Sequence, residues 1–237
     1  MTDEPYRWLE AVAQRREYVR DQIRDATPVF AVGLPDGILV LGLGAPGTKV
    51  FEVHDRHAVA ALGHPSDIER IRQAAIDAAH LEAFTRAPED LSLRRLVGFS
   101  LSAAVKGAFE DLRAAPVLAE FLFVELADTP AKDVFARLHA DGGFSFSSRF
   151  SVAAAQGEAE IRAALETSLE GAVDRTDAAR RCLAAWEGWV AGEAGRQVAP
   201  NPARGVDSPS WEAAWLRRHG GPAARFEPLP VQTLGLP

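Results

Sequence analysis

Cysteine is almost absent from this sequence, because Cys182 is the single one among 237 residues. One thiol cannot form an internal disulfide or a zinc site of the CxxC type, so we expect a reducing compartment and a cytoplasmic location. No apolar run approaches the roughly 20 residues that a transmembrane helix needs. The opening residues MTDEPYRW lack the basic-then-apolar pattern of a signal peptide. We therefore expect neither a membrane span nor a secretion signal.

Positive charge is scarce as well. The chain has 26 Lys and Arg residues against 33 Asp and Glu residues, which gives a formal net charge of −7 at pH 7. A protein that neutralises phosphates needs a basic surplus, so nucleic acid is not an expected partner. What is present is ordinary globular composition, 47% hydrophobic and 25% charged, with length for one large domain or two small ones.

One short motif suggests a cofactor. Residues 42–47, GLGAPG, match the GxGxxG pattern of dinucleotide-binding proteins, and an apolar strand at 38–41 precedes them. The pyrophosphate site also needs a helix that opens on the glycines, whereas residues 48–53 alternate like a second strand. Pro46 removes a backbone donor from the loop. A nucleotide-binding oxidoreductase would rest on this loop alone, so we expect a strand–turn–strand connection and no cofactor.

The pattern of helices and strands indicates the fold class. Helices come in consecutive pairs and strands in consecutive hairpins, which favours antiparallel sheets over a parallel βαβ arrangement. The sequence therefore predicts an α+β protein built as a four-layer αββα sandwich, with helix pairs flanking two sheets. The predicted helices span about 6–25, 66–87, 89–113, 158–170 and 175–193. The predicted strands flank turns at 34–37, 54–56 and 141–142, cover 117–126, and close the chain after a loop at 194–208.

A longer stretch resembles a known family. KVFEVHDRHAVAALGHPSDIERIRQAAIDAAHLEA, beginning at Lys49, resembles 20S proteasome subunits: a lysine, an apolar strand, an acidic turn with Asp-Arg, a second strand to glycine, and a helix. A helix ahead of the first strand is a mark of α-type subunits, and the chain is most similar to the bacterial α-type. The resemblance implies the Ntn-hydrolase fold and a single domain over 1–237. Its parts would be an N-terminal helix at 6–25, an αββα core at 27–226 and a tail at 227–237.

The resemblance also implies a structural, non-catalytic subunit, although an enzyme stays possible. Catalytic subunits of the family use an N-terminal threonine whose free amine acts as the base, together with a Lys and an Asp. The matching positions here are Thr27, Lys49 and Leu43, and leucine carries no charge. The alternative is a self-processing threonine protease, in which removal of the segment up to Ala26 would expose Thr27 as the nucleophile beside Lys49.

Partners follow from the same resemblance. The resemblance implies a ring that stacks on β-type rings, or on itself, and restricts access to a chamber, so we expect a ring homo-oligomer, with β-type subunits and a ring ATPase activator as partners. Lys49 would bind the C-terminal carboxylate of the activator; the alternative is a surface lysine that opens a strand. The predicted ring contacts lie on the opening helix, at Trp8, Val12, Val19 and Ile23, and on the helix that begins at Ser66.

Two further clusters carry other chemistry in principle. His54, His57 and His64 are close in sequence, but the first two point to opposite sides of a strand, so we expect solvated turn histidines and no metal site. Trp186 and Trp189 lie three residues apart on a predicted helix, which favours the core or an interface over a ligand site.

Overall fold

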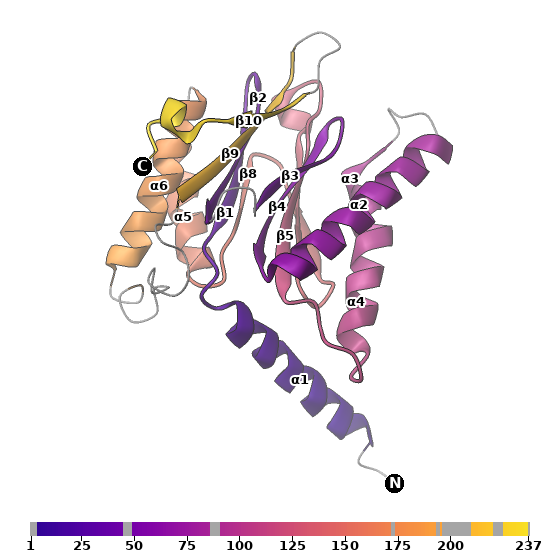
Figure 1. Cartoon of the computed structure of the whole chain (residues 1–237). Coiled ribbons are helices and arrows are strands. Elements are labelled where there is room, and N and C mark those ends of the chain that lie inside the picture. The colour runs from indigo at the N-terminus through magenta and orange to yellow at the C-terminus, as the bar shows by residue number, and fades with distance from the viewer. Residues whose placement is uncertain are drawn as a thin grey trace.

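The fold consists of two five-stranded antiparallel sheets between two helical layers (Figure 1). The computed structural model describes residues 4–44, 49–85, 91–171, 174–192, 195, 210–219 and 225–236. The strands of the first sheet are β1 (Val29–Leu34), β2 (Gly37–Gly44), β8 (Phe150–Ala153), β9 (Ser210–Arg217) and β10 (Phe226–Leu229), in the order β10-β9-β2-β1-β8. The second sheet has the order β3-β4-β5-β6-β7, from β3 (Val50–His54), β4 (His57–Gly63), β5 (Ala119–Glu125), β6 (Val134–Leu138) and β7 (Phe144–Ser147). The predicted four-layer αββα sandwich is confirmed.

Three apolar clusters separate the four layers. The middle cluster lies between the sheets, and the other two lie between each sheet and its helices. The helices α2 (Pro65–Thr85), α3 (Leu93–Arg95) and α4 (Ser102–Glu110), with the π-helical segment η2 (Leu96–Leu101), cover the second sheet. The helices α5 (Glu158–Ser168) and α6 (Arg175–Ala191) cover the first. Each sheet is buried on both faces, which is why strands such as β2 are apolar along their whole length.

The opening helix α1 (Glu4–Ile23) closes one end of the sandwich. Val19 and Ile23 enter the apolar cluster between the sheets. Arg15 donates hydrogen bonds to the carbonyls of Ala108 (3.1 Å) and Ala114 (2.7 Å), near the end of α4. The N-terminal half of α1 projects away from the sandwich (Figure 1). Within the described part of the chain, no helix combines the length and apolarity of a membrane span.

One predicted strand is in fact two. The segment after the Asp-Gly turn forms β7 in the second sheet and β8 in the first, and Ser148 and Arg149 carry the chain from one sheet to the other. The Arg149 carbonyl accepts a 2.8 Å hydrogen bond from the Gly33 amide, which fixes this crossing against β1. The sequence carries only a weak sign of the break, because Ser147, Ser148 and Arg149 interrupt the alternation there without a Gly or Pro.

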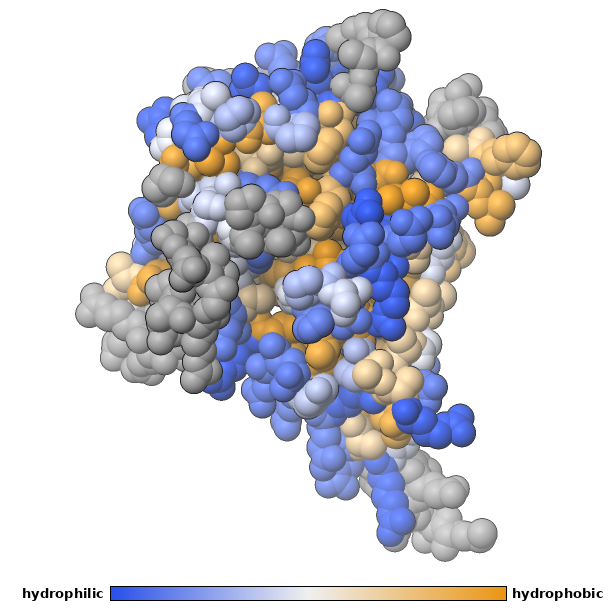
Figure 2. Space-filling view, in the orientation of Figure 1, coloured by the Kyte–Doolittle hydropathy of each residue, from blue (hydrophilic) through white to orange (hydrophobic). Residues whose placement is uncertain are grey.

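The segment predicted as one helix at 89–113 also differs from the prediction. Residues 89 and 90 lie outside the described residues, and the segment consists of α3, η2 and α4, ending at Glu110. The wider π turn leaves Leu96 and Leu101 buried while the Phe99 side chain is 79% exposed. A shallow pocket separates Phe99 from Leu81 on α2. Apolar surface gathers over the C-terminal end of α2 (Figure 2), where Leu81 and Phe84 are largely exposed.

The segment predicted as a tail belongs to the folded core. It contains most of β10 and the 3-10 helix η4 (Val231–Leu234). Leu229, Leu234 and Leu236 are buried in the apolar cluster that α6 covers. The predicted loop at 194–208 lies outside the described residues except for Gly195. A short 3-10 helix, η3 (Pro130–Lys132), precedes β6.

Candidate functional site

Lys49 lies at the start of β3, at the end of the sandwich that α1 closes. Its ammonium donates a 2.7 Å hydrogen bond to the backbone carbonyl of Thr27, where α1 leads into β1. The Lys49 side chain is buried, with 8% of the residue exposed. In this structure Lys49 is therefore not the plain surface lysine of one sequence interpretation. It is a charged group held inside a junction of three segments.

Two glycines of the GxGxxG match make room for this lysine. A Cβ atom on Gly42 would lie 2.8 Å from Cβ of Lys49, and one on Gly44 would lie 2.7 Å from Cε. Both distances are shorter than carbon atoms tolerate, so the lysine stem packs directly on the glycine backbone. β2 ends at Gly44 and β3 begins at Val50, which confirms two strands with residues 45–48 outside the described residues. Among the described elements, the one that follows these glycines is the strand β3 and not a helix.

Glu212 completes the site, and the sequence analysis missed it. Its carboxylate accepts hydrogen bonds from the backbone amides of Lys49 (3.1 Å) and Val50 (3.3 Å). Glu212 lies on β9, opposite Gly42 in the antiparallel pair of β2 and β9. Its bonds therefore join the first sheet to the point where the chain enters β3 of the second sheet. A signal was present, since Glu212 is the one charge in the otherwise apolar run WEAAWL.

Burial and charge act on Lys49 in opposite directions. Burial penalises the ammonium, and the negative charge of Glu212 offsets part of that penalty, which leaves the pKa of Lys49 at about 7 instead of 10.5. Near neutral pH both the charged and the neutral form of Lys49 are populated. The charged form can bind a carboxylate, and the neutral form cannot do so by charge.

The Thr27 hydroxyl is engaged differently from a nucleophile. It donates a hydrogen bond to the backbone carbonyl of Leu43. The Thr27 nitrogen is in a peptide bond with Ala26, whose own amide bonds to the Ile23 carbonyl at 2.8 Å. A threonine hydrolase needs a free amine there and an acid at position 43, and Leu43 is apolar and buried. The threonine-protease alternative is therefore not favoured.

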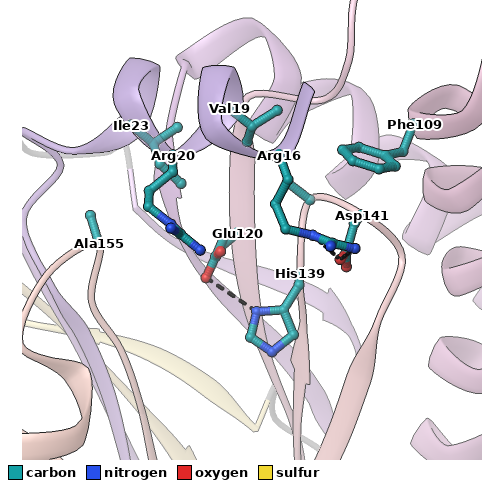
Figure 3. Close-up of a pocket in the computed structure, with 10 residues that line it drawn as sticks. Arg16, Val19, Arg20, Ile23, Phe109, Glu120, His139, Asp141 and Ala155 are labelled. Atoms are coloured by element: carbon teal, nitrogen blue, oxygen red, sulfur yellow. Dashed lines mark hydrogen bonds and ion pairs between the residues drawn. The ribbon is translucent and has the colours of Figure 1, made fainter. Parts of the chain in front are cut away.

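A separate pocket lies between α1 and the ends of β5 and β6 (Figure 3). Arg16 forms a 3.0 Å ion pair with Asp141, and Arg20 points toward Glu120 (Figure 3). Glu120 also pairs with the buried Arg137 at 2.6 Å. Burial opposes the charged form of Glu120, but the hydrogen bond from His139 and the charge of Arg137 outweigh it and lower the pKa of Glu120 to about 2.

The predicted ring contacts divide into two groups. Val19 and Ile23 are each 5% exposed and pack inside the chain's own core, so in this structure they offer little surface to a neighbour. Val12 is partly buried against the same cluster. Trp8 is 44% exposed, and Leu9 beside it is 64% exposed. Contact through α1 stays a prediction, and it now rests on the outer half of that helix.

The prediction of solvated turn histidines is wrong for His57. His57 begins β4 and is 2% exposed, because the pairing of β4 with β5 places it opposite Glu125, whose Oε2 lies 3.8 Å from His57 Nε2. The rings of His54 and His80 meet edge to face, with centroids 5.4 Å apart. His64 Nδ1 forms a 2.9 Å hydrogen bond with the Ser66 hydroxyl. Among the described residues, no three metal-ligand side chains gather at one point.

The tryptophan pair on α6 is part of the core. The rings of Trp186 and Trp189 stack with centroids 5.1 Å apart. Both pack in the cluster between α6 and the first sheet, as predicted.

Comparison with known proteins connects this geometry to a family. No family model matches the chain. Individual relatives do: the chain is 30% identical over 164 residues to "Proteasome subunit alpha" of Actinosynnema mirum, covering 68% of this chain and 62% of that protein. It is 28% identical over 212 residues to the protein of the same name from Pseudarthrobacter chlorophenolicus, covering 89% and 86%. A third, from Acidothermus cellulolyticus, is 30% identical over 156 residues and matched over 64% of each chain. The matches thus span slightly less than two thirds of the first and third relatives.

The αββα sandwich of two antiparallel sheets is consistent with proteasome α-type subunits, and Thr27, two residues before β1, lies beside the buried Lys49. These relatives support a bacterial α-type proteasome subunit.

Proposed function

We propose that this chain is a non-catalytic ring subunit that stacks on a proteolytic β-type ring, controls entry to its chamber, and docks a ring ATPase. The observation that carries the proposal is the packing of α1. Val19 and Ile23 fill the space between the sheets at the end where Thr27 lies, and the chain runs unbroken from α1 into β1. A catalytic site needs that end open and the Thr27 amine free.

Two separate apolar surfaces support an assembly that both forms a ring and stacks. The first is the outer half of α1, with Trp8 and Leu9. The second, the α2–η2 patch, consists of Leu81, Phe84 and Phe99. Large apolar side chains gathered on a surface mark contacts with other subunits. A ring of identical chains uses one pair of surfaces around the ring, so a further surface is needed to stack. We assign α1 to the ring neighbour and the α2–η2 patch to the β-type ring.

Lys49 is the proposed receptor for the terminal carboxylate of the activator. An ammonium has three N–H donors, so a carboxylate can bind without loss of the bond to the Thr27 carbonyl. The contact would be a charge-assisted hydrogen bond in a place already withdrawn from water. A cytoplasmic location belongs to the proposal as well, and it rests on the lone Cys182, which is buried.

The test uses purified rings and a fluorescent peptide that ends in the last ten residues of a candidate ring ATPase. Lys49→Ala should weaken binding at least about tenfold, since loss of a partly desolvated charge contact costs roughly 2–5 kcal/mol. Lys49→Arg should restore little, because a planar guanidinium does not fit where the lysine stem packs on Gly42 and Gly44. The control is Lys106→Ala, which removes an exposed lysine that pairs with Glu110 on α4.

If wild-type, Lys49→Ala and Lys49→Arg rings bind the peptide with equal affinity, Lys49 is not the receptor for the carboxylate. The same peptide with a C-terminal amide should bind as weakly to wild type as the acid does to Lys49→Ala. Non-catalysis has its own test: the intact mass should include residues 1–26, and fluorogenic peptides should not be cleaved. Cleavage that Thr27→Ala abolishes would reverse the proposal.

A further inference from the structure

Glu212 occupies an unusual place for a carboxylate. It extends from β9 in the first sheet and accepts hydrogen bonds from the amide just before β3 (3.1 Å) and from the first amide of β3 in the second sheet (3.3 Å). These amides belong to Lys49 and Val50, so the bonds fix the backbone from which the lysine side chain starts. Glu212 is partly buried, so its carboxylate loses part of its hydration, which favours a role that needs its charge.

The negative charge of Glu212 acts on Lys49, and the other described groups around the Lys49 side chain are uncharged. The segments packed around Lys49 supply Gly42 and Gly44 from β2, and the Thr27 carbonyl from the junction of α1 and β1. Among the described residues, Glu212 is the group whose charge acts on the Lys49 amine, and it favours the ammonium against burial. Without that charge, less of Lys49 would be protonated at neutral pH, and an incoming carboxylate would find a neutral amine.

We propose that Glu212 is the positioning residue of the Lys49 site: it anchors the start of β3 and supplies the counter-charge that keeps the Lys49 ammonium available to a terminal carboxylate. The inference rests on the proposed function of Lys49. It adds a form of regulation to that function, because the binding of the carboxylate to Lys49 then depends on pH near neutrality. It also involves two opposing effects, since the same negative charge repels the incoming carboxylate.

The first test needs no ligand. The chain has three lysines, at positions 49, 106 and 132, so ε-¹³C-lysine labelling gives three NMR signals that Lys49→Arg assigns. In wild type, the Lys49 signal should titrate near pH 7. In Glu212→Gln the Lys49 titration should move down by about one pH unit. Glu212→Asp, which keeps the charge, should restore most of it. An unchanged titration in Glu212→Gln would overturn the inference.

The second test separates the charge from a merely structural effect. The affinities of the carboxylate peptide for wild type and Glu212→Gln are compared from pH 5.5 to 8.5. At low pH Lys49 is protonated in both proteins, so the variant should bind equally or more tightly, because the repulsion is gone. At high pH its relative affinity should fall by the same factor as the shift in titration, about tenfold. A loss that is constant with pH would show that Glu212 acts only on the fold.

The control variant is Glu227→Gln on β10, which removes an exposed carboxylate that pairs with Arg217. It should alter neither the titration nor the pH dependence. If the peptide binds none of these proteins, the activator proposal fails, but the NMR titration still decides whether Glu212 sets the charge of Lys49.

Discussion

Arg218 and Asp133 bind each other side by side, through hydrogen bonds of 2.8 Å and 2.7 Å between side chains that are almost fully buried. The same guanidinium donates to the carbonyls of Pro35 (2.9 Å) and Leu34 (3.1 Å). One ion pair therefore joins the end of β9, the turn after β1 and the segment before β6. It lies at the end of the sandwich opposite α1.

Asp133→Asn should strongly destabilise the chain, because it leaves a buried guanidinium without its counter-charge. The expected loss is about 3–5 kcal/mol in the free energy of unfolding, measured by urea denaturation. Glu227→Gln, which breaks the exposed pair with Arg217, should cost less than about 1 kcal/mol. Similar losses in the two variants would show that the buried pair contributes no more than an exposed one.

Gly42→Ala should destabilise the chain by roughly 1–3 kcal/mol, because its Cβ would meet Cβ of Lys49, which cannot move without the backbone. Gly44→Ala meets the movable Cε instead, so it should displace the ammonium and weaken carboxylate binding more than stability. Most of the cost of Gly42→Ala should disappear in the background of a second substitution, Lys49→Gly. As a control, Gly107→Ala in α4 meets nothing within 4 Å and should stabilise by about 0.5–1 kcal/mol.

The low pKa of Glu120 makes the free energy of unfolding depend on pH in the acid range. Its pKa is about 2 in the folded chain, against 4.5 for the ordinary group, so the folded state favours the ionised form. That contribution, about 3 kcal/mol at 1.4 kcal/mol per unit, is complete above pH 4.5 and is lost as the pH falls toward 2. The difference in unfolding free energy between wild type and Glu120→Gln should accordingly shrink from pH 6 to pH 2. A difference that stays constant over this range would contradict the assignment.

Trp8→Glu should dissolve the ring without unfolding the chain, since Trp8 is 44% exposed on the part of α1 that projects. Light scattering should then show the 25.5 kDa monomer, with a melting temperature close to that of wild-type chains. Phe84→Glu, in the α2–η2 patch, should leave the ring intact and abolish stacking on a β-type ring. If Phe84→Glu dissolves the ring and Trp8→Glu does not, the two surfaces have been assigned in the wrong order.

Local patterns in the sequence were sufficient for the layers but not for the details that build the site. The turns at 34–37 and 54–56 and the helix from Ser66 carry strong local signals, and the structure has them at β1–β2, β3–β4 and α2. The division of one predicted strand into β7 and β8 depends on which sheet each half joins, and this is a long-range property. The same holds for Glu212, whose partners lie more than 160 residues away in the chain.

The crossing at Ser148 and Arg149 also limits how the sandwich can come apart. Two residues connect β7 to β8, so on this side a short covalent link holds the two sheets together. On the opposite side β3 and β10 are edge strands. There the sheets are tied by Glu212 to β3 and by the 3.5 Å ion pair of Arg225 with Asp55. The Lys49 site lies on that side, so a ligand bound there would add a further link between the two sheets where side-chain contacts of this kind join them.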